Sequence, residues 1–421
     1  MKLIKETKSR CPECLKVVNA SIFEKENGVW MHKKCDEHGE FEAFVEQDAD
    51  FYKRTMNDKN ETCPFQSVVM PITHKCNLNC SFCFVPNRKL EDEPLDNIKK
   101  QINKIIIEES PQEAICLSGG EPTLRQDLFE IIKFIKRQRP FLHVTILTNG
   151  IKLADLSYVK KLKEAGLDSV TFSLNGFDDA VYQKINNAKL SSIKIKALNN
   201  LKKEKVATIL SPTLVRGLNE KELKPIFDFA LNNLDFVKEV RMRGAAAVGR
   251  YFEINPLTTS EMLELTSNAL DVDKDFFLRD FSKKDCYHSA YHFHTFLFID
   301  QDKRIIDWSY YKKFKKPTVR NAVKAIKILF NILSRKKIKD IFLALIKSGI
   351  LMPALHRPFR NWEGSPFLRM LNVYILRINI WYWADKNNVD LNEIKAWGMK
   401  HATADGKVLP FSEAMIRADE L

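Results

Sequence analysis

Between residues 66 and 250, short apolar runs alternate with amphipathic stretches. The apolar and β-branched runs predict six strands, at 67–73, 114–118, 143–148, 169–174, 207–215 and 237–243. Apolar residues at helical spacing predict five helices between them, at 95–108, 125–138, 155–165, 179–204 and 219–233. This alternation predicts parallel βα units whose sheet is covered by helices. The pattern fits an open doubly wound sheet and a curved, partial barrel equally well.

The segments on either side of this core follow other patterns. In residues 1–60, alternating apolar positions lie between two pairs of metal-ligand residues. A unit this short needs a bound metal or another cross-link to stay folded. Residues 320–352 mix Lys with apolar residues at helical spacing, and residues 353–421 are rich in Trp, Phe, Arg and Pro. We therefore predict a metal-binding unit at 1–60, a catalytic core at 66–250 and an α-rich, substrate-binding extension at 251–421.

The charge of the chain is concentrated in one region. The 421 residues carry a formal net charge of +13, and residues 312–347 contain twelve Lys or Arg and one acid, Asp340. A basic amphipathic segment of this kind can form a helical layer with a solvated Lys face, or lie on an anionic membrane surface. In the membrane interpretation, Trp381, Tyr382 and Trp383 are interfacial aromatics. A nucleic-acid partner is the least favoured interpretation because no nucleic-acid-binding module is recognisable.

The expected location follows from targeting signals and cysteine usage. Residues 1–8 turn polar too early for a secretory signal, and no apolar run of about 18 residues predicts a transmembrane helix. The nine cysteines fall mostly in closely spaced groups, which favours metal ligation over disulfides in a reducing compartment. We expect a cytoplasmic protein, with a peripheral position at the inner face of the membrane as the alternative.

One group of ligand residues lies near the N-terminus. Cys11 and Cys14 are separated by two residues, and Cys35 and His38 have the same separation. Three thiolates and one imidazole at this spacing are typical of a small tetrahedral site for Zn²⁺, with mononuclear iron in a rubredoxin-like site as the alternative. His32 is a second candidate for the imidazole ligand. A reduced loop with free cysteines is the interpretation without a metal.

A second group, Cys76, Cys80 and Cys83, follows directly after the first predicted strand. Three thiolates on one loop can ligate three irons of a 4Fe–4S cluster. The fourth iron then has no ligand from this motif, which is what a cluster needs if another molecule is to bind to it. The alternatives are a zinc site and an electron-transfer cluster that takes Cys63 as its fourth ligand.

The spacing of this triplet, with Phe82 before the last cysteine, resembles the signature of the radical S-adenosylmethionine (SAM) superfamily. The Ser-Gly-Gly-Glu-Pro sequence at 118–122 is similar to that family's Gly-Gly-Glu motif. The resemblance implies a partial (β/α)6 barrel in which a 4Fe–4S cluster cleaves SAM to a 5′-deoxyadenosyl radical. That radical takes hydrogen from an unactivated C–H bond, and flavodoxin or ferredoxin would supply the electron.

The same resemblance places candidate SAM contacts at the carboxyl ends of the predicted strands. They are Gly119, Gly120, Glu121, Pro122, Asn149, Ser173, Asn175, Thr213 and Arg216. Arg241 and Arg243, on the sixth predicted strand, are further candidates for the SAM carboxylate or the substrate. Surface ion pairing is the alternative role for Arg216, Arg241 and Arg243, and a surface position is likewise the alternative for Thr213.

Both ends of the chain also resemble the tetraether lipid synthase group, which includes a methanogen pterin methylase relative. The resemblance rests on residues 7–14, 35–39 and 401–411. The group's cysteines for auxiliary clusters are missing, and Ser412 stands where one of them would be. We therefore expect a single cluster and a single radical site.

These resemblances give a leading expectation and an alternative. The leading expectation is a radical SAM enzyme that functionalises a lipid chain, and the alternative is modification, for example methylation, of a soluble pterin, nucleoside or peptide. A non-catalytic iron–sulfur protein is disfavoured because a cluster carrier needs no Gly-Gly-Glu motif. Cys286, close to His288, is a candidate hydrogen-atom donor or metal ligand, with an ordinary packed loop as the alternative.

Overall fold

The computed structural model describes residues 1–26, 28–56, 66–85, 91–108, 112–246, 255–278, 292–306, 374–395, 398–403 and 405–417. Cys63, Cys286 and the basic segment at 312–347 lie outside these residues, so the expectations placed on them stay predictions. The domain boundaries likewise stay a prediction. Among the described residues, no helix is long and apolar enough to cross a membrane.

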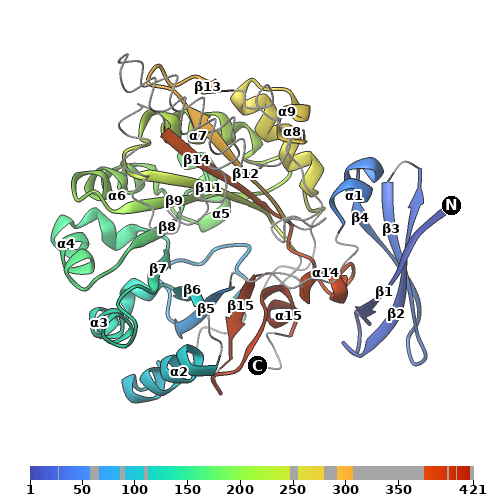
Figure 1. Cartoon of the computed structure of the whole chain (residues 1–421), viewed down its shortest axis with the longest axis horizontal. Helices are drawn as coiled ribbons and strands as arrows, with labels where there is room; N and C mark the ends of the chain where they lie inside the picture. Colours follow the sequence, from blue (N-terminus) through green and yellow to red (C-terminus); the bar gives the residue numbers. More distant parts are fainter. Residues whose placement is uncertain are drawn as a thin grey trace, which may run out of the picture.

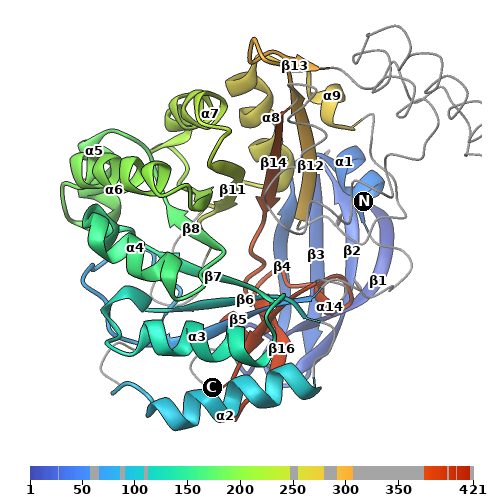
Figure 2. The same cartoon turned by 60° about the vertical axis from the view of Figure 1, so that its left-hand side comes forward.

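The N-terminal residues form an antiparallel sheet of four strands in sequential order. They are β1 (Lys2–Arg10), β2 (Val17–Lys25), β3 (Gly28–Cys35) and β4 (Gly39–Glu46). A short helix, α1 (Ala49–Thr55), follows, and the Asp48 carboxylate caps it by accepting a hydrogen bond from the Phe51 amide. Figures 1 and 2 show this unit in blue beside the larger sheet. Ile22 and Met31 are fully buried, so the alternating pattern serves to bury one face of the small sheet.

A parallel sheet forms the centre of the molecule. Its strands, neighbours in this order, are β5 (Gln66–Thr73), β6 (Gln112–Gly119), β7 (His143–Thr148), β8 (Ser169–Ser173), β9 (Ala207–Ser211) and β11 (Val237–Gly244). The short β10 (Thr213–Leu214) pairs with β11. These strands are the six that the apolar runs predicted, and the partial barrel of parallel βα units is confirmed.

The helices between these strands lie outside the curved sheet (Figure 2). They are α2 (Leu95–Glu108), α3 (Leu128–Gln138), α4 (Leu156–Glu164), α5 (Asp179–Asn186), α6 (Ser191–Lys203) and α7 (Leu223–Asn232). Single 3-10 turns, η1 (Pro122–Leu124), η2 (Ile151–Ala154) and η3 (Glu220–Glu222), precede three of them. The helix predicted at 179–204 is two helices, because Asn187 takes a left-handed conformation at φ +54° and ends the first.

The C-terminal part extends the sheet at both edges. β14 (Tyr374–Trp381) pairs in parallel with β11, and β12 (His292–Ile299) and β13 (Ile305–Ile306) continue that edge in antiparallel pairings. At the opposite edge, β15 (Met399–Ala402) pairs in parallel with β5 and antiparallel with β16 (Val408–Pro410). The helices of this part are α8 (Thr259–Leu270), α9 (Lys274–Leu278), α14 (Leu391–Lys395) and α15 (Phe411–Ile416). Helices were predicted for this part of the chain, and these strands were missed.

The aromatic residues at the end of β14 are inside the protein. Tyr382 is 2% exposed and Trp383 is 8% exposed, and the Tyr382 hydroxyl accepts a hydrogen bond from Asn388. Trp381 packs edge-on against His292 of the neighbouring strand. The interpretation of these three residues as interfacial aromatics is therefore wrong, because they continue a central strand of the sheet and contact other side chains there.

Candidate active site and N-terminal metal site

The predicted N-terminal ligands converge on one point. The Sγ atoms of Cys11, Cys14 and Cys35 and one ring nitrogen of His38 lie within 4.8 Å of one another. The Cys14 and Cys35 sulfurs are 3.9 Å apart, and His38 Nδ1 lies 3.5 Å from Cys35 Sγ. Zn–S bonds of about 2.3 Å and a Zn–N bond of about 2.0 Å in tetrahedral geometry require separations of about 3.6–3.8 Å. The four residues therefore fit Zn²⁺, while His32 faces Glu40 instead.

The N-terminal unit is joined to the C-terminal helices near this metal site. Lys5 forms ion pairs with Asp390 at 2.9 Å and Glu393 at 2.7 Å. The Arg10 guanidinium donates to the Leu15 carbonyl inside the metal loop, and its other end pairs with Glu413 of α15. The loop that holds the metal is thus connected to the segment that closes the barrel.

Cys76, Cys80 and Cys83 lie on the loop that follows β5. Cys76 and Cys80 pack against an apolar cluster formed by Leu78, Tyr182 and Leu190. Asn186 donates a hydrogen bond from Nδ2 to Cys80 Sγ over 3.0 Å. A donor aimed at a sulfur stabilises a thiolate ligand, and hydrogen bonds to cluster sulfurs are a common means of adjusting cluster potential. This environment agrees with a thiolate ligand at Cys80, and the three cysteines stay the predicted ligands of the cluster.

The aromatic residue after the last cysteine anchors this loop. Phe84 packs edge-on against Trp383, with ring centroids 5.4 Å apart, and against Phe411, with centroids 6.2 Å apart. Trp383 and Phe411 in turn contact each other at 5.3 Å. These aromatics join Val69 and Cys116 in an apolar cluster that fills one side of the barrel interior. The C-terminal segment thus supports the cluster loop and keeps water from that side.

Gly119 and Gly120 pack directly against the backbone that leads into the cysteine loop. A Cβ on Gly119, which has φ +115°, would lie 2.0 Å from the Thr73 carbonyl oxygen, and a Cβ on Gly120 would lie 2.2 Å from the Lys75 carbonyl oxygen. The Gly120 and Glu121 amides donate to these same two carbonyls, over 2.8 Å and 2.7 Å. The glycines are therefore required for contact between two loops, apart from any contact with a ligand.

Glu121 connects the ends of two strands. Its carboxylate accepts hydrogen bonds from the Thr123 amide and hydroxyl, from the Thr148 hydroxyl and from the Asn149 amide. The residue is 1% exposed. The Asn149 side chain donates to Asn77 Oδ1 inside the cysteine loop over 2.7 Å. The Gly-Gly-Glu motif thus ties the ends of β5, β6 and β7 together around the triplet.

A buried lysine lies behind the next two candidate positions. Lys194 of α6 is 2% exposed and donates to the carbonyls of Asn149 and Ser173 over 2.7 Å and 2.6 Å. Its ammonium lies over the rings of Phe172 and Tyr182. Burial lowers the pKa of Lys194 to about 8. No sequence pattern singled out this residue, because a buried Lys on a helix has the same spacing as a solvated one.

The remaining candidates differ in where they lie. Asn175, 2% exposed, accepts a hydrogen bond from the Thr213 amide, so both residues connect strand ends inside the protein. Arg216 forms two hydrogen bonds of 2.8 Å with Glu261, and this pairing raises its pKa. The guanidinium of Arg216 is therefore engaged by α8, which agrees with the ion-pairing alternative for this residue. Ser173 and Asn149 stay predicted SAM contacts.

The inner wall made by β11 and β14 carries charged side chains. Glu239, which is fully buried, accepts hydrogen bonds from Arg241 and Asn379, each over 2.6 Å. Arg243 donates from Nε to the Thr213 hydroxyl over 2.9 Å. Burial lowers the pKa of Arg243 to about 10, and the thiols of Cys80 and Cys83 act in the opposite direction. The arginines were predicted from their strand, but Glu239 and Asn379 were missed.

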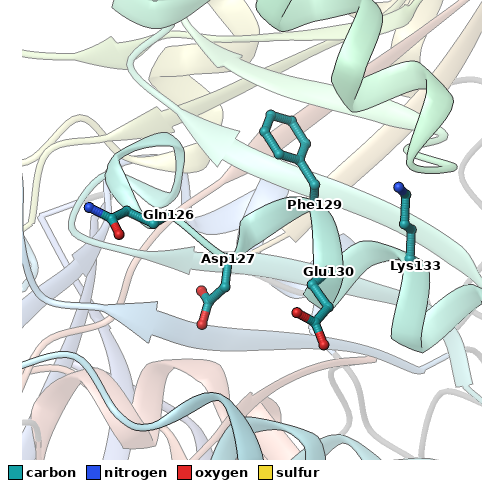
Figure 3. A pocket seen from close by; sticks show the side chains of 5 residues that line it. All are labelled: Gln126, Asp127, Phe129, Glu130 and Lys133. Atoms are coloured by element: carbon teal, nitrogen blue, oxygen red, sulfur yellow. The ribbon is translucent and has the colours of Figure 1, made fainter.

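A surface groove of about 510 Å³ lies elsewhere, beside the start of α3. Figure 3 shows Asp127 and Glu130 pointing to the same side, with Phe129 on the other side. Asp127 is already paired with Arg125 at 2.6 Å. The groove is on the outer helical layer and contains none of the predicted site residues, so it contributes nothing to the candidate active site.

Two family models match the chain. The radical SAM superfamily model matches residues 70–230, which include the three cysteines and the Gly-Gly-Glu motif. The chain is a radical SAM enzyme. A model of the HMPTM N-terminal zinc ribbon domain matches residues 3–47, which contain the four converging ligands. The expected cofactors, a 4Fe–4S cluster, SAM and a metal ion in the N-terminal unit, are confirmed, and the ribbon favours zinc.

Relatives of this radical SAM enzyme include two kinds of named protein. The 7,8-dihydro-6-hydroxymethylpterin dimethyltransferase of Methanocaldococcus jannaschii is 28% identical, covering 97% of this chain and 92% of that protein. The GTP 3′,8-cyclase of Nautilia profundicola is 34% identical over 38% of this chain, and the match covers about half of that protein, 51%. The expected likeness to a methanogen pterin methylase is confirmed.

Solved structures with a similar fold include Streptococcus suis SuiB bound to S-adenosylmethionine. Its TM-score is 0.43 at 17% identity, covering 50% of this chain and 48% of that one. Methylornithine synthase is similar with a TM-score of 0.38 at 16% identity, covering 52% of this chain and 68% of that one.

Proposed function

We propose that this radical SAM enzyme modifies a soluble, pterin-like heterocycle. This was the alternative expectation from the sequence, and it replaces the lipid chain as the favoured substrate. The relative whose match spans 97% of this chain is named for a dimethyl transfer to a hydroxymethyl dihydropterin. A carbon–methyl transfer to such a ring is therefore the reaction that we propose. The hydrogen taken from the ring leaves in 5′-deoxyadenosine, a second SAM molecule gives the methyl group and leaves as S-adenosylhomocysteine, and the reductant supplies the two electrons.

The polarity of the barrel interior carries the proposal. Strand alternation places Thr145, Thr171 and Ser211 on the face opposite Val144, Val170 and Leu210, which pack in the main apolar core. All three hydroxyl oxygens are buried and have no hydrogen-bond partner within the described part of the chain.

Charged side chains complete this face, because β11 adds Glu239, Arg241 and Arg243 to it. A lipid chain against such a wall would leave these groups unsatisfied, at a cost of about 1–3 kcal/mol for each buried polar group. A flat heterocycle with ring nitrogens, an exocyclic amine and a carbonyl offers partners for them.

The roles of the site residues follow from their positions and are part of the proposal. Cys76, Cys80 and Cys83 hold the cluster, which when bound supplies the electron that cleaves SAM and so generates the hydrogen-abstracting radical. Lys194 holds the carbonyls of Asn149 and Ser173 by hydrogen bonds. These two residues lie at the carboxyl ends of β7 and β8, where SAM binds in this proposal. On the other side of the cysteine loop, the aromatic cluster around Phe84 excludes water.

The proposal is tested by substrate-dependent turnover. The reconstituted, reduced enzyme is incubated with SAM and 7,8-dihydro-6-hydroxymethylpterin under anaerobic conditions, and 5′-deoxyadenosine and pterin products are measured by mass spectrometry. We expect 5′-deoxyadenosine formation to rise with the pterin and a product heavier by one or two methylenes. Cys80→Ala should abolish both. Turnover of extracted lipids in place of the pterin would contradict the proposal and restore the lipid interpretation.

A further inference from the structure

Two arginines on the inner wall of the barrel repeat one arrangement. Arg241 stacks over Trp381 with its guanidinium carbon 5.1 Å from the ring centroid, and Arg243 stacks over Trp383 at 4.9 Å. Arg243 pairs with Trp381 across the strands, so the two stacks lie in successive layers of the wall. Same-face residues on a strand are about 6.6 Å apart, which lets both guanidiniums reach one ligand group.

Each guanidinium is held by one edge only. Arg241 donates from Nε to Glu239, and Arg243 donates from Nε to Thr213. Within the described residues, the terminal nitrogens of both arginines make no hydrogen bond. An arginine that is fixed at Nε and stacked on an aromatic ring has little freedom left to lose, and its terminal nitrogens form the fork that suits a carboxylate or phosphate.

The surroundings of the arginines also contain buried donors that have no acceptor among the described residues. The indole Nε1 atoms of Trp381 and Trp383 are buried without a hydrogen-bond partner among the described residues. Ser211, at the carboxyl end of β9, has a buried hydroxyl in the same condition. A buried donor without an acceptor is costly, and each of these groups would be satisfied by a ligand rich in oxygen acceptors.

The charge balance of the wall agrees with an anionic ligand. Arg377 of β14 also lies 3.6 Å from Glu239, so the carboxylate that contacts Arg241 is shared between two guanidiniums. His292 beside them adds no further positive charge, because burial lowers its pKa to about 4. Arg241 and Arg243 thus place two guanidiniums close together in a poorly hydrated interior, where an anionic ligand is favoured.

We propose that Arg241 and Arg243, stacked on Trp381 and Trp383, bind the phosphate of a phosphorylated heterocyclic substrate. The inference rests on the proposed function, since it names the form of the heterocycle that enters the barrel. Arg243, on which the charges of Cys80 and Cys83 act, can contact the SAM carboxylate as well as the phosphate, whereas Arg241 contacts the phosphate alone. A phosphate accepts from both arginines and from the indole donors at once, which a neutral hydroxymethyl group does not.

The experiment compares two matched pairs of ligands on the SAM-bound holoenzyme. Dissociation constants are measured anaerobically for 7,8-dihydro-6-hydroxymethylpterin and its phosphate monoester, and for guanosine and its 5′-monophosphate. In whichever pair binds to the enzyme, we expect the phosphorylated ligand to bind at least about tenfold more tightly than the unphosphorylated one. Two charge-assisted hydrogen bonds to the phosphate imply a difference of this size. Arg241→Gln should remove that preference, and Arg137→Gln, an exposed arginine on α3, should leave it intact.

The outcomes separate this inference from the proposed function. Turnover of the pterin with equal affinity for both of its forms would overturn the inference and leave the function standing. A phosphate preference seen with the guanosine pair alone, and lost in Arg241→Gln, would support the inference while the pterin assignment fails. Inorganic pyrophosphate must also compete with the phosphorylated ligand for the unmodified enzyme. This measurement tests the inference even if the Arg241→Gln variant fails to fold. Competition by phosphatidylglycerol vesicles in place of pyrophosphate would overturn the inference in favour of a lipid headgroup.

Discussion

Replacing Gly120 by Ala tests whether the Gly-Gly-Glu motif acts through packing or through its ligand. The new Cβ would lie 2.2 Å from the Lys75 carbonyl oxygen and 2.8 Å from the His74 carbonyl oxygen, both of them backbone atoms that cannot turn aside. Overpacking typically costs about 1–3 kcal/mol. Separation of the two loops would also weaken the hydrogen bonds from the Gly120 and Glu121 amides, at about 1 kcal/mol each. We expect a loss of about 3–5 kcal/mol.

The assay is urea unfolding of the protein before cluster reconstitution and without SAM, followed by measurement of iron bound after reconstitution. Gly217→Ala is the control, since Gly217 has a left-handed φ of +75° but nothing within 4 Å of its added Cβ. That control should lose about 1–2 kcal/mol from backbone strain alone and bind iron normally. If Gly120→Ala matches the unmodified protein in stability and iron content but fails to bind SAM, the packing argument is refuted.

Three further changes test other contacts. Cys35→Ser should remove zinc from the ribbon and lower the melting temperature by several degrees, measured by metal analysis and calorimetry; retention of one zinc ion would contradict the ligand assignment. Phe411→Ala should cost about 3–5 kcal/mol and speed iron loss to a chelator, whereas Phe141→Ala, 98% exposed, should do neither. Burial lowers the pKa of His143 to about 4, so only the unfolded chain gains its proton between pH 6.5 and 4. As the pH decreases through this range, His143 should therefore lower the free energy of unfolding by up to about 1.4 kcal/mol per pH unit. The urea midpoint of His143→Gln should decrease less between pH 7 and pH 5.5 than that of the unmodified protein.

The parallel core was predictable because its signals are local. Each buried strand is a short apolar run and each covering helix has its own apolar stripe, so periodicity alone located six strands and the helices between them. The breaks inside two of the predicted elements have local causes as well. Pro212 lacks an amide donor and separates β9 from β10, and Asn187 ends α5. Both residues were visible in the sequence.

The edges of the sheet were not predictable in the same way. β14 pairs with β11 across more than a hundred residues, and no local pattern records that partnership. Its sequence does alternate, with Leu376 and Ile378 toward the core and Arg377 and Asn379 on the other face, and this alternation was the signal that was overlooked. Glu239 and Lys194 were missed for a related reason, since a charged residue becomes a buried one only when distant segments cover it.

The C-terminal segment explains why the missing auxiliary cysteines leave a coherent site. Ser412 stands where a cysteine was expected from the resemblance, and it is 2% exposed on α15, with Phe411 on one side of it in sequence and Ala414 beyond. Those neighbours belong to the apolar cluster that holds Phe84 and hence the cysteine loop. A position that would carry a second cluster's ligand is thus part of the packing that supports the first. The same helix pairs with Arg10 of the zinc ribbon, so we expect metal binding at the N-terminus to stabilise the segment that supports the cluster loop.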